Sequence, residues 1–221
     1  MTRKKSVFLE THNINNRATG FGTFNYELIK GLEKLPFDNL ELYLNSKKPN
    51  ELKSEFGDKF KYQQYIGAHR YKNFRPLKKY DLWHSVNQNS KIEPRYDTKY
   101  LLTVHDVNFV EEISSDMNHK RNLAFIEKLK KSTAITYISE FAKKQTHQYF
   151  NVPNVPEHII YNGNPISNIL DTSNFTPNII SEKPFFFSIG DFIERKNFQS
   201  IVKMMIHITD FNLIIAGNND K

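Results

Sequence analysis

Short apolar runs alternate with amphipathic helical patterns along most of this sequence, and that alternation limits the folds open to the chain. The runs have the length of buried strands, and the patterns between them have helical period. We predict strands at residues 6–10, 40–44, 82–85, 100–105, 134–138, 159–160, 185–189 and 212–216. We predict helices at residues 23–35, 118–131, 140–150 and 197–206, with Ser139 as the N-cap of the third. Strands separated by helices pair in parallel and are covered on both faces.

The pattern therefore predicts an α/β fold with a Rossmann-like first domain at residues 1–163. Residues 164–184 are rich in Asn, Ser, Thr and Pro and have no sustained period, so we interpret them as an interdomain linker. Residues 185–221 then supply one strand, one helix and a second strand. This is too little for an independent doubly wound domain, so we predict the start of a second Rossmann-like domain.

Composition narrows the classes of partner. The absence of cysteine excludes disulfides and thiolate metal sites, and it suits a reducing cytosol. A net charge of +7 favours anionic partners. The lysines are spread along helical stretches such as LKKS (129–132) and AKKQT (142–146). This distribution argues against a nucleic-acid partner. It allows peripheral contact with an anionic membrane. No signal peptide or membrane span is predicted, so we expect a cytoplasmic protein, either free or peripheral at the inner membrane face.

Two glycines lie between the first predicted strand and the first predicted helix. They are Gly20 and Gly22, in RATGFGTFNYELIKGL (17–32). Glycine lets the backbone turn tightly and approach a ligand, and a helix N-terminus presents amides to an anion. A full dinucleotide motif would require glycine at the position of Asn25, which argues against a nicotinamide cofactor. A turn that merely needs glycine is the alternative.

A histidine and an aspartate stand where the strand predicted at residues 100–105 ends. In open α/β sheets the carboxyl ends of the strands line the ligand crevice, so His105 is placed to bind a substrate hydroxyl. Asp106 could orient the ring or cap the next turn. The alternative is a histidine that only satisfies buried backbone groups. No metal site is predicted, because the other histidines do not stand at a compact ligand spacing from His105.

Two adjacent cations follow the strand that opens the second domain. In FFFSIGDFIERKNF (185–198), Gly190 ends the strand, and Arg195 and Lys196 precede the helix. A guanidinium can bind two phosphate oxygens at once, and an ammonium adds a compact charge, so the pair suits a diphosphate. A solvated charge cluster is the alternative.

Taken in order, six segments resemble the landmarks of GT-B glycosyltransferases of family 4. They are GFGTFNYELIKGL, LLTVHDVNF, AITYISEFAKKQT, HIIYNGNP, FFFSIGDFIERKNF and LIIAG, and together they extend over almost the whole chain. The resemblance implies two facing Rossmann-like domains, with the nucleotide-sugar donor on the second and the acceptor on the first. It also implies a transfer that needs no metal or cofactor, retains anomeric configuration and serves cell-surface polysaccharide synthesis, with a slight leaning towards mannose donors.

The resemblance also implies roles for individual residues. Arg195 and Lys196 match the cations that hold the donor diphosphate. Gly20 and Gly22 match the loop that faces the donor phosphates and the acceptor. His105 matches the histidine beside the donor sugar, where it would stabilise an oxocarbenium-like centre.

Four further positions complete the predicted site or depart from the family pattern. Asp106 is grouped with His105 as catalytic, and Asn87 and Gln88 are assigned to a glycan or lipid-linked acceptor. Asp191 stands where many members carry an arginine. The paired glutamates of the family would fall beyond Lys221, so we expect little transfer by these 221 residues alone. A sugar-nucleotide epimerase or hydrolase, and a non-catalytic binding module, are the alternatives.

Overall fold

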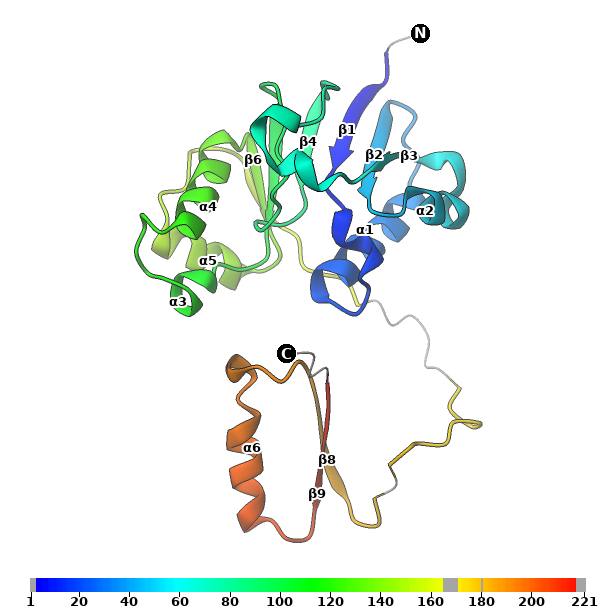
Figure 1. Ribbon diagram of the computed structural model, residues 1–221, viewed down its shortest axis with the longest axis vertical. Helices are drawn as coiled ribbons and strands as arrows, with labels where there is room; N and C mark the ends of the chain where they lie inside the picture. The colour runs from blue at the N-terminus through cyan, green and yellow to red at the C-terminus, as the bar shows by residue number, and fades with distance from the viewer. Residues whose placement is uncertain (1–2, 165–170, 180, 218–221) are drawn as a thin grey trace. The chain divides into compact units, whose positions relative to one another are not determined.

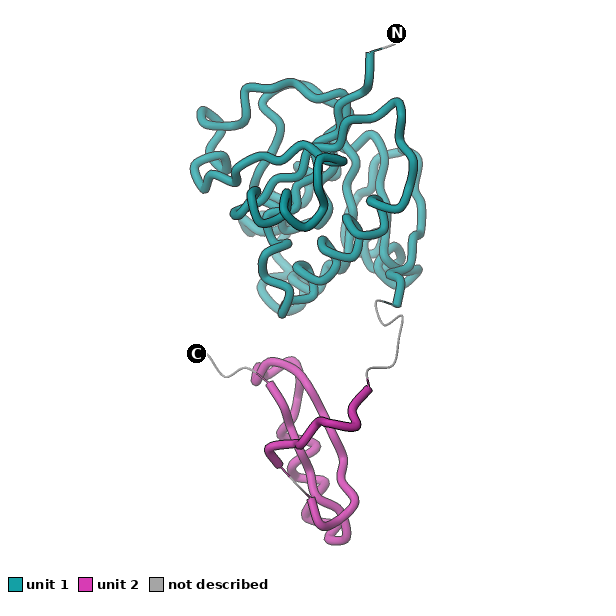
Figure 2. Tube along the Cα trace, turned by 90° about the vertical axis from the view of Figure 1, so that its right-hand side faces the viewer, with its two compact units in different colours: residues 1–165 teal, residues 166–221 magenta. Residues whose placement is uncertain are grey.

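The computed structural model describes residues 3–164, 171–179 and 181–217, and the chain divides into two compact units. They are Met1–Pro165 (unit 1) and Ile166–Lys221 (unit 2), drawn in different colours in Figure 2. Residues 165–170 and 180 of the predicted linker lie outside the described residues. Within the described ranges, no helix has the length and apolar character needed to cross a bilayer.

Unit 1 is built on a seven-stranded sheet in which every neighbouring pair is parallel (Figure 1). Its order is β3-β2-β1-β4-β5-β6-β7. The strands are β1 (Lys5–Leu9), β2 (Leu40–Ser46), β3 (Lys61–Gln64), β4 (Leu82–Ser85), β5 (Lys99–Val104), β6 (Ala134–Tyr137) and β7 (Glu157–Ile159). This sheet confirms the predicted α/β, Rossmann-like architecture. Sequence patterns do not identify β3, because KYQQ contains no apolar run.

Helices cover the sheet, and Figure 1 shows α1 and α2 near β1–β3 and α3–α5 near β6. Their bounds are α1 (Gly20–Glu33), α2 (Pro49–Phe56), α3 (Phe109–Glu112), α4 (Lys120–Lys131) and α5 (Glu140–Tyr149). The predicted N-cap of α5 is confirmed, because Ser139 Oγ accepts a hydrogen bond from the amide of Ala142 at 3.1 Å. Helix α1 begins three residues earlier than predicted, because Thr19 caps it and accepts from the amide of Gly22 at 3.2 Å. Gly20 and Gly22 therefore lie in the first helical turn and not in a loop.

Strand β1 is buried on both faces and separates two hydrophobic cores. Phe8 enters the core beneath β4–β6, where its ring stacks on Trp83 with centroids 3.8 Å apart. Val7 and Leu9 point to the opposite face and pack with Ile29 of α1. This alternation follows from the two-residue period of a strand, and it explains why β1 reads as an unbroken apolar run.

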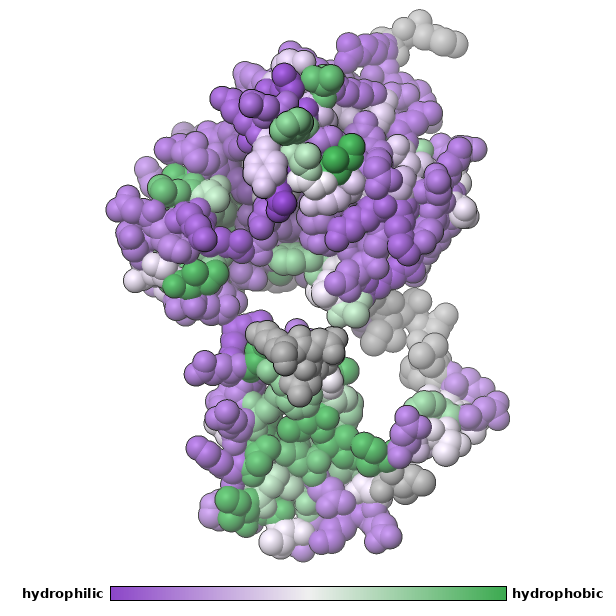
Figure 3. All heavy atoms as spheres, viewed as in Figure 1, coloured by the Kyte–Doolittle hydropathy of each residue, from purple (hydrophilic) through white to green (hydrophobic). Residues whose placement is uncertain are grey.

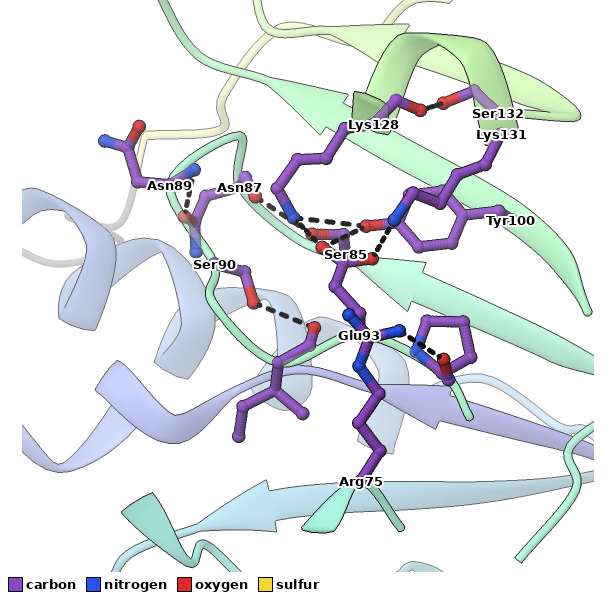
Figure 4. A network of polar contacts seen from close by, with 12 residues as sticks. Arg75, Ser85, Asn87, Asn89, Ser90, Glu93, Tyr100, Lys128, Lys131 and Ser132 are labelled. Carbon is purple, nitrogen blue, oxygen red and sulfur yellow. Dashed lines mark hydrogen bonds and ion pairs between the residues drawn. The ribbon is translucent and has the colours of Figure 1, made fainter. Parts of the chain in front are cut away.

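A buried cluster of charges ties the loop between β4 and β5 to α4 (Figure 4). The carboxylate of Glu93 pairs with the ammonium of Lys128 and with that of Lys131, the latter at 2.7 Å, and accepts from the hydroxyl of Tyr100 at 3.2 Å. The side chains of Glu93 and Lys128 are 9% and 5% exposed. Burial alone would raise the pKa of Glu93, but the two ammonium groups outweigh it and hold that pKa below its usual value.

Unit 2 contains β8 (Phe185–Ile189), α6 (Phe198–Met204) and β9 (Asn212–Ala216), with β8 and β9 parallel. Both strands match their predicted bounds. Helix α6 ends two residues before its predicted end and continues as a 3₁₀ turn. Figure 3 shows a broad hydrophobic area on this unit. Phe185, Phe187 and Ile189 of β8 are exposed.

Candidate functional site

The candidate site lies where β1, β4 and β5 end. These strands are neighbours in a parallel sheet, so the residues that follow them meet at one edge. Glu10 follows β1, Gln88 lies in the loop after β4, and His105 follows β5. The strand order reverses between β1 and β4, which is where open α/β sheets leave room for a ligand.

Gln88 joins the loop after β4 to the residues after β5. Its Oε1 accepts from the amide of His105 at 3.1 Å, and its Nε2 donates to Asp106 Oδ1 at 3.2 Å. Gln88 is 4% exposed and Asn87 is 1% exposed. Asn87 uses its Oδ1 to accept from the amide of Asn89 at 2.9 Å. Both amides thus hold the loop in shape, and their contact with an acceptor stays a prediction.

The His105 ring is held in one orientation. Its Nε2 lies 3.0 Å from the carbonyl oxygen of Val86, and because a carbonyl only accepts, this nitrogen carries the proton. Burial lowers the pKa of His105, so the ring is neutral near pH 7 and its Nδ1 keeps a lone pair. The rings of Phe21 and Phe24 lie beside it in T-shaped arrangements, with centroids 5.0 and 4.5 Å from that of His105. Val86 is the hydrogen-bond partner of Nε2, while Asp106, predicted either to orient the ring or to cap the next turn, accepts from Gln88.

The two predicted glycines differ in what surrounds them. A Cβ added to Gly22 would lie 1.8 Å from the carbonyl oxygen of Asn16, whereas one added to Gly20 would meet nothing within 4 Å. Gly22 is therefore needed so that α1 can pack closely against the turn that precedes it. The sequence suggested that glycine lets the backbone approach a ligand closely. At Gly22 the close approach is to the backbone of Asn16.

Replacing Gly22 with Ala should lower the free energy of unfolding of unit 1 by about 2 kcal/mol. The added methyl overpacks the contact with Asn16, and this outweighs the better helix propensity of alanine. Urea unfolding followed by the fluorescence of Trp83, the single tryptophan, measures the change. Gly20→Ala is the matched control and should cost nothing; equal losses in the two variants would contradict this account.

A carboxylate–imidazole pair at the end of β1 belongs to the site but is not among the residues predicted from the sequence. Glu10 Oε1 lies 2.6 Å from Nδ1 of His12 and accepts from Nδ2 of Asn45 at 3.2 Å. Glu10 is fully buried, and its Oε2 has no hydrogen-bond partner among the described residues. The His12 side chain is 18% exposed, so the pair presents an oriented imidazole at the edge of the site. Its signal in the sequence is a polar triplet directly after a buried strand.

A pocket of about 630 Å³ opens between α1, the face of β4–β6 and residues 160–164. Gly20 is the predicted site residue that lines it. A row of polar groups crosses its wall: His84 Nε2 lies 2.8 Å from Thr103 Oγ1, which lies 2.8 Å from Thr136 Oγ1. Burial lowers the pKa of His84 to about 4, so this histidine is neutral near pH 7.

The two predicted diphosphate ligands belong to unit 2. Arg195 and Lys196 lie in a 3₁₀ turn directly before α6, and both are exposed. The stem of Lys196 passes over Gly190, with its Cε 3.5 Å from where a Cβ on that glycine would lie. Asn197 adopts a left-handed conformation with φ of 50°, which redirects the chain into α6.

The part of the chain that the structure describes contains no cluster of three or more His, Asp or Glu side chains suited to a metal ion. The groups available at the ends of β1, β4 and β5 are amides, a neutral imidazole and carboxylates, which bind hydroxyl groups. The turn before α6 carries the carboxylate of Glu194 and the two cations Arg195 and Lys196, and cations of this kind bind anions.

Comparison with solved structures places this architecture among known folds. Sucrose-phosphate synthase from Thermosynechococcus elongatus aligns with a TM-score of 0.66 and 14% identity over 98% of this chain and 63% of the synthase. A glycosyltransferase from Rickettsia africae ESF-5 aligns with a TM-score of 0.49 and 13% identity over 99% of this chain and 69% of the other. No family model matches the sequence, and a search of curated proteins found no match. The chain thus spans less than two thirds of the synthase and shares its fold.

Proposed function

We propose that this protein is a glycosyltransferase that moves a hexose from a nucleotide-diphosphate sugar to a glycan or lipid-linked acceptor. The observation that supports the proposal is the order of the two units along the chain, in a fold shared with sucrose-phosphate synthase. A Rossmann-like unit with a neutral His105 at its strand ends is followed by a β-α-β unit with Arg195 and Lys196 in its first loop. The first can bind sugar hydroxyls, and the second can bind a diphosphate.

The proposed chemistry is electrostatic. As the bond between sugar and nucleotide breaks, charge builds on the leaving diphosphate, and Arg195 and Lys196 stabilise it without a metal. The Nδ1 lone pair of His105 accepts from a hydroxyl of the donor sugar and holds the ring in place while positive charge develops. We propose that the transfer retains the anomeric configuration, as the resemblance to family 4 implies.

We place this activity in the synthesis of cell-surface polysaccharide on the cytoplasmic side of a membrane. Lipid-linked acceptors lie at that surface, and the basic net charge of +7 suits contact with anionic lipid. Asn87 and Gln88 keep a proposed role in shaping the acceptor side of the site, through the loop that they hold.

Titration calorimetry with uridine and guanosine diphosphate sugars tests the donor site. Each cation should contribute about tenfold to affinity through charge-assisted hydrogen bonds, so Arg195→Gln combined with Lys196→Gln should weaken binding about 100-fold. Lys203→Gln, which removes an exposed cation from α6 of the same unit, is the matched control. Undiminished binding by the double variant would refute the assignment.

Analysis of the product tests the reaction. NMR of the product anomer should show retention when a suitable acceptor is supplied, and His105→Ala should slow transfer more than it weakens donor binding. An inverted product would overturn the stereochemical part of the proposal. Release of free sugar without an acceptor would instead identify a hydrolase or epimerase.

A further inference from the structure

Residues 65–79 form most of the segment that joins β3 to β4, and they combine positive charge with exposed apolar side chains. Their sequence, YIGAHRYKNFRPLKK, contains five Lys or Arg residues and no Asp or Glu. Four of their large apolar side chains are exposed: Ile66 by 48%, Tyr71 by 57%, Phe74 by 63% and Leu77 by 71%. We call residues 65–79 the basic–aromatic segment. Small hydrophobic areas among hydrophilic atoms are visible on unit 1 in Figure 3.

The backbone of the basic–aromatic segment is fixed by hydrogen bonds. It forms two 3₁₀ turns, and the amide of Phe74 donates to the carbonyl of Tyr71 at 3.0 Å. Two arginines join it to the loop before β5: Arg95 donates to the carbonyl of Asn73 at 3.1 Å, and Arg75 donates to that of Pro94 at 3.2 Å. The apolar side chains therefore project from an ordered support.

A cationic pocket lies against these apolar side chains. It has a volume of about 580 Å³, and its lining includes Arg75, Lys78 and Arg95 together with Phe74 and Leu77. The described residues that line it include no carboxylate. The Nε of Arg75 is buried without a hydrogen-bond partner in the described structure. The cations that line this pocket suit a phosphate group.

The nearest carboxylates in the sequence leave this charge largely intact. Asp81 is already paired with Arg3 at 3.1 Å and accepts from the amide of Ser6 at 2.8 Å. Asp97 is exposed close to Arg95 and contributes one opposing charge. The segment therefore keeps an excess of positive charge beside its apolar side chains.

We propose that the basic–aromatic segment docks unit 1 on an anionic phospholipid bilayer. Phe74 and Leu77 enter the boundary between headgroups and acyl chains, while the cations contact lipid phosphates. This deepens the membrane contact that belongs to the proposed function, but it needs no glycosyl transfer, so either proposal can fail without the other.

The helical lysines that the sequence suggested for this contact are less suitable. On α4, Lys130 pairs with Glu127 at 2.9 Å and Lys131 with Glu93 at 2.7 Å. On α5, Lys143 lies 3.6 Å from Glu157. Carboxylates close to these ammonium groups reduce their attraction to anionic lipid, whereas the pocket beside the basic–aromatic segment has cations and no lining carboxylate.

Vesicle sedimentation with the full chain tests the proposal. Vesicles of phosphatidylglycerol and phosphatidylcholine should bind the protein in low salt, and binding should fall as salt rises or when the anionic lipid is omitted. Lys78→Gln combined with Lys79→Gln should weaken binding about 25-fold, at about fivefold per cation. Phe74→Ser combined with Leu77→Ser should weaken it about tenfold or more.

The matched control is Phe141→Ser combined with Lys144→Gln. It removes one exposed aromatic residue and one exposed lysine from α5, and it should leave binding unchanged. Unaltered thermal unfolding confirms that each variant is folded. As a second measurement, Phe74→Trp should show a blue shift of tryptophan emission with anionic vesicles, above the signal of the buried Trp83.

Three results would overturn the proposal. The first is no binding of the unaltered chain to anionic vesicles. The second is equal binding by all variants, which would place the contact on another surface, such as the apolar face of β8. The third is loss of vesicle binding in millimolar inorganic phosphate, which would identify a site for a soluble anion.

Discussion

Replacing Glu93 with Gln is expected to lower the free energy of unfolding of unit 1 by about 3–5 kcal/mol. The substitution keeps the shape of the side chain but leaves the ammonium of Lys128, which is 5% exposed, without a charged partner. It also weakens the tie between α4 and the loop that carries Gln88. The loss arises from burial of an uncompensated charge, so it should appear at any pH at which Lys128 is protonated.

Urea unfolding monitored by Trp83 measures this loss, because the residue is 1% exposed within the core of unit 1. The matched control is Lys130→Gln, also on α4. Lys130 and Glu127 form an exposed pair, with side chains 68% and 65% exposed, so the control should cost less than about 1 kcal/mol. A loss below about 1 kcal/mol in Glu93→Gln would show that the buried cluster is not a major source of stability.

Acidification from pH 6.5 to pH 4 should destabilise unit 1 by up to about 3 kcal/mol through His84 alone. Burial lowers the pKa of this histidine from 6.5 to about 4. Between pH 6.5 and pH 4 His84 is mostly protonated in the unfolded chain but mostly neutral in the folded chain. The free energy of unfolding therefore decreases as the pH falls. The figure is an upper limit, because part of His84 faces the pocket beside α1.

Urea unfolding at several pH values between 4 and 6.5 gives the slope of the free energy of unfolding against pH. His84→Gln should flatten it, since glutamine does not titrate, while His158→Gln, at an exposed position on β7, should not. His105 adds a contribution of the same sign, because burial also lowers its pKa. Carboxylates such as Glu93, whose pKa is below the usual value, act at lower pH. An identical slope in His84→Gln and the unaltered chain would contradict the prediction.

The strands of this fold are readable from sequence where apolar residues stand next to one another, whether or not the strand is buried. The bounds of β8 and β9 match the prediction, because each is a short, mostly apolar run with clear ends, and the bounds of β4 (LWHS) match it as well. Strand β3 cannot be predicted from an apolar run, because its residues are polar and partly exposed. Their extended conformation depends on pairing with β2. The start of α1 depends on one side chain, Thr19, whose capping bond extends the helix back to Gly20.

The candidate site is only partly readable, for a physical reason. The position of a residue at the carboxyl end of a strand follows from the local pattern, which is why His105 and Gln88 can be selected from sequence. Their hydrogen-bond partners come from other strands: Val86 orients the ring of His105, and Asn45 contacts Glu10. Such pairings depend on strand order, which a single sequence does not specify.

The central place of β1 has a consequence for synthesis of the chain. Val7 pairs with Leu42 on one side and with Leu82 on the other. The part from β1 to β3 can begin to pack once residue 64 has left the ribosome, but one edge of β1 then stays open until β4 follows. At about 5–20 residues per second this interval lasts roughly 1–4 s. We expect the nascent chain to be most prone to wrong strand pairing, and most dependent on chaperones, during that interval.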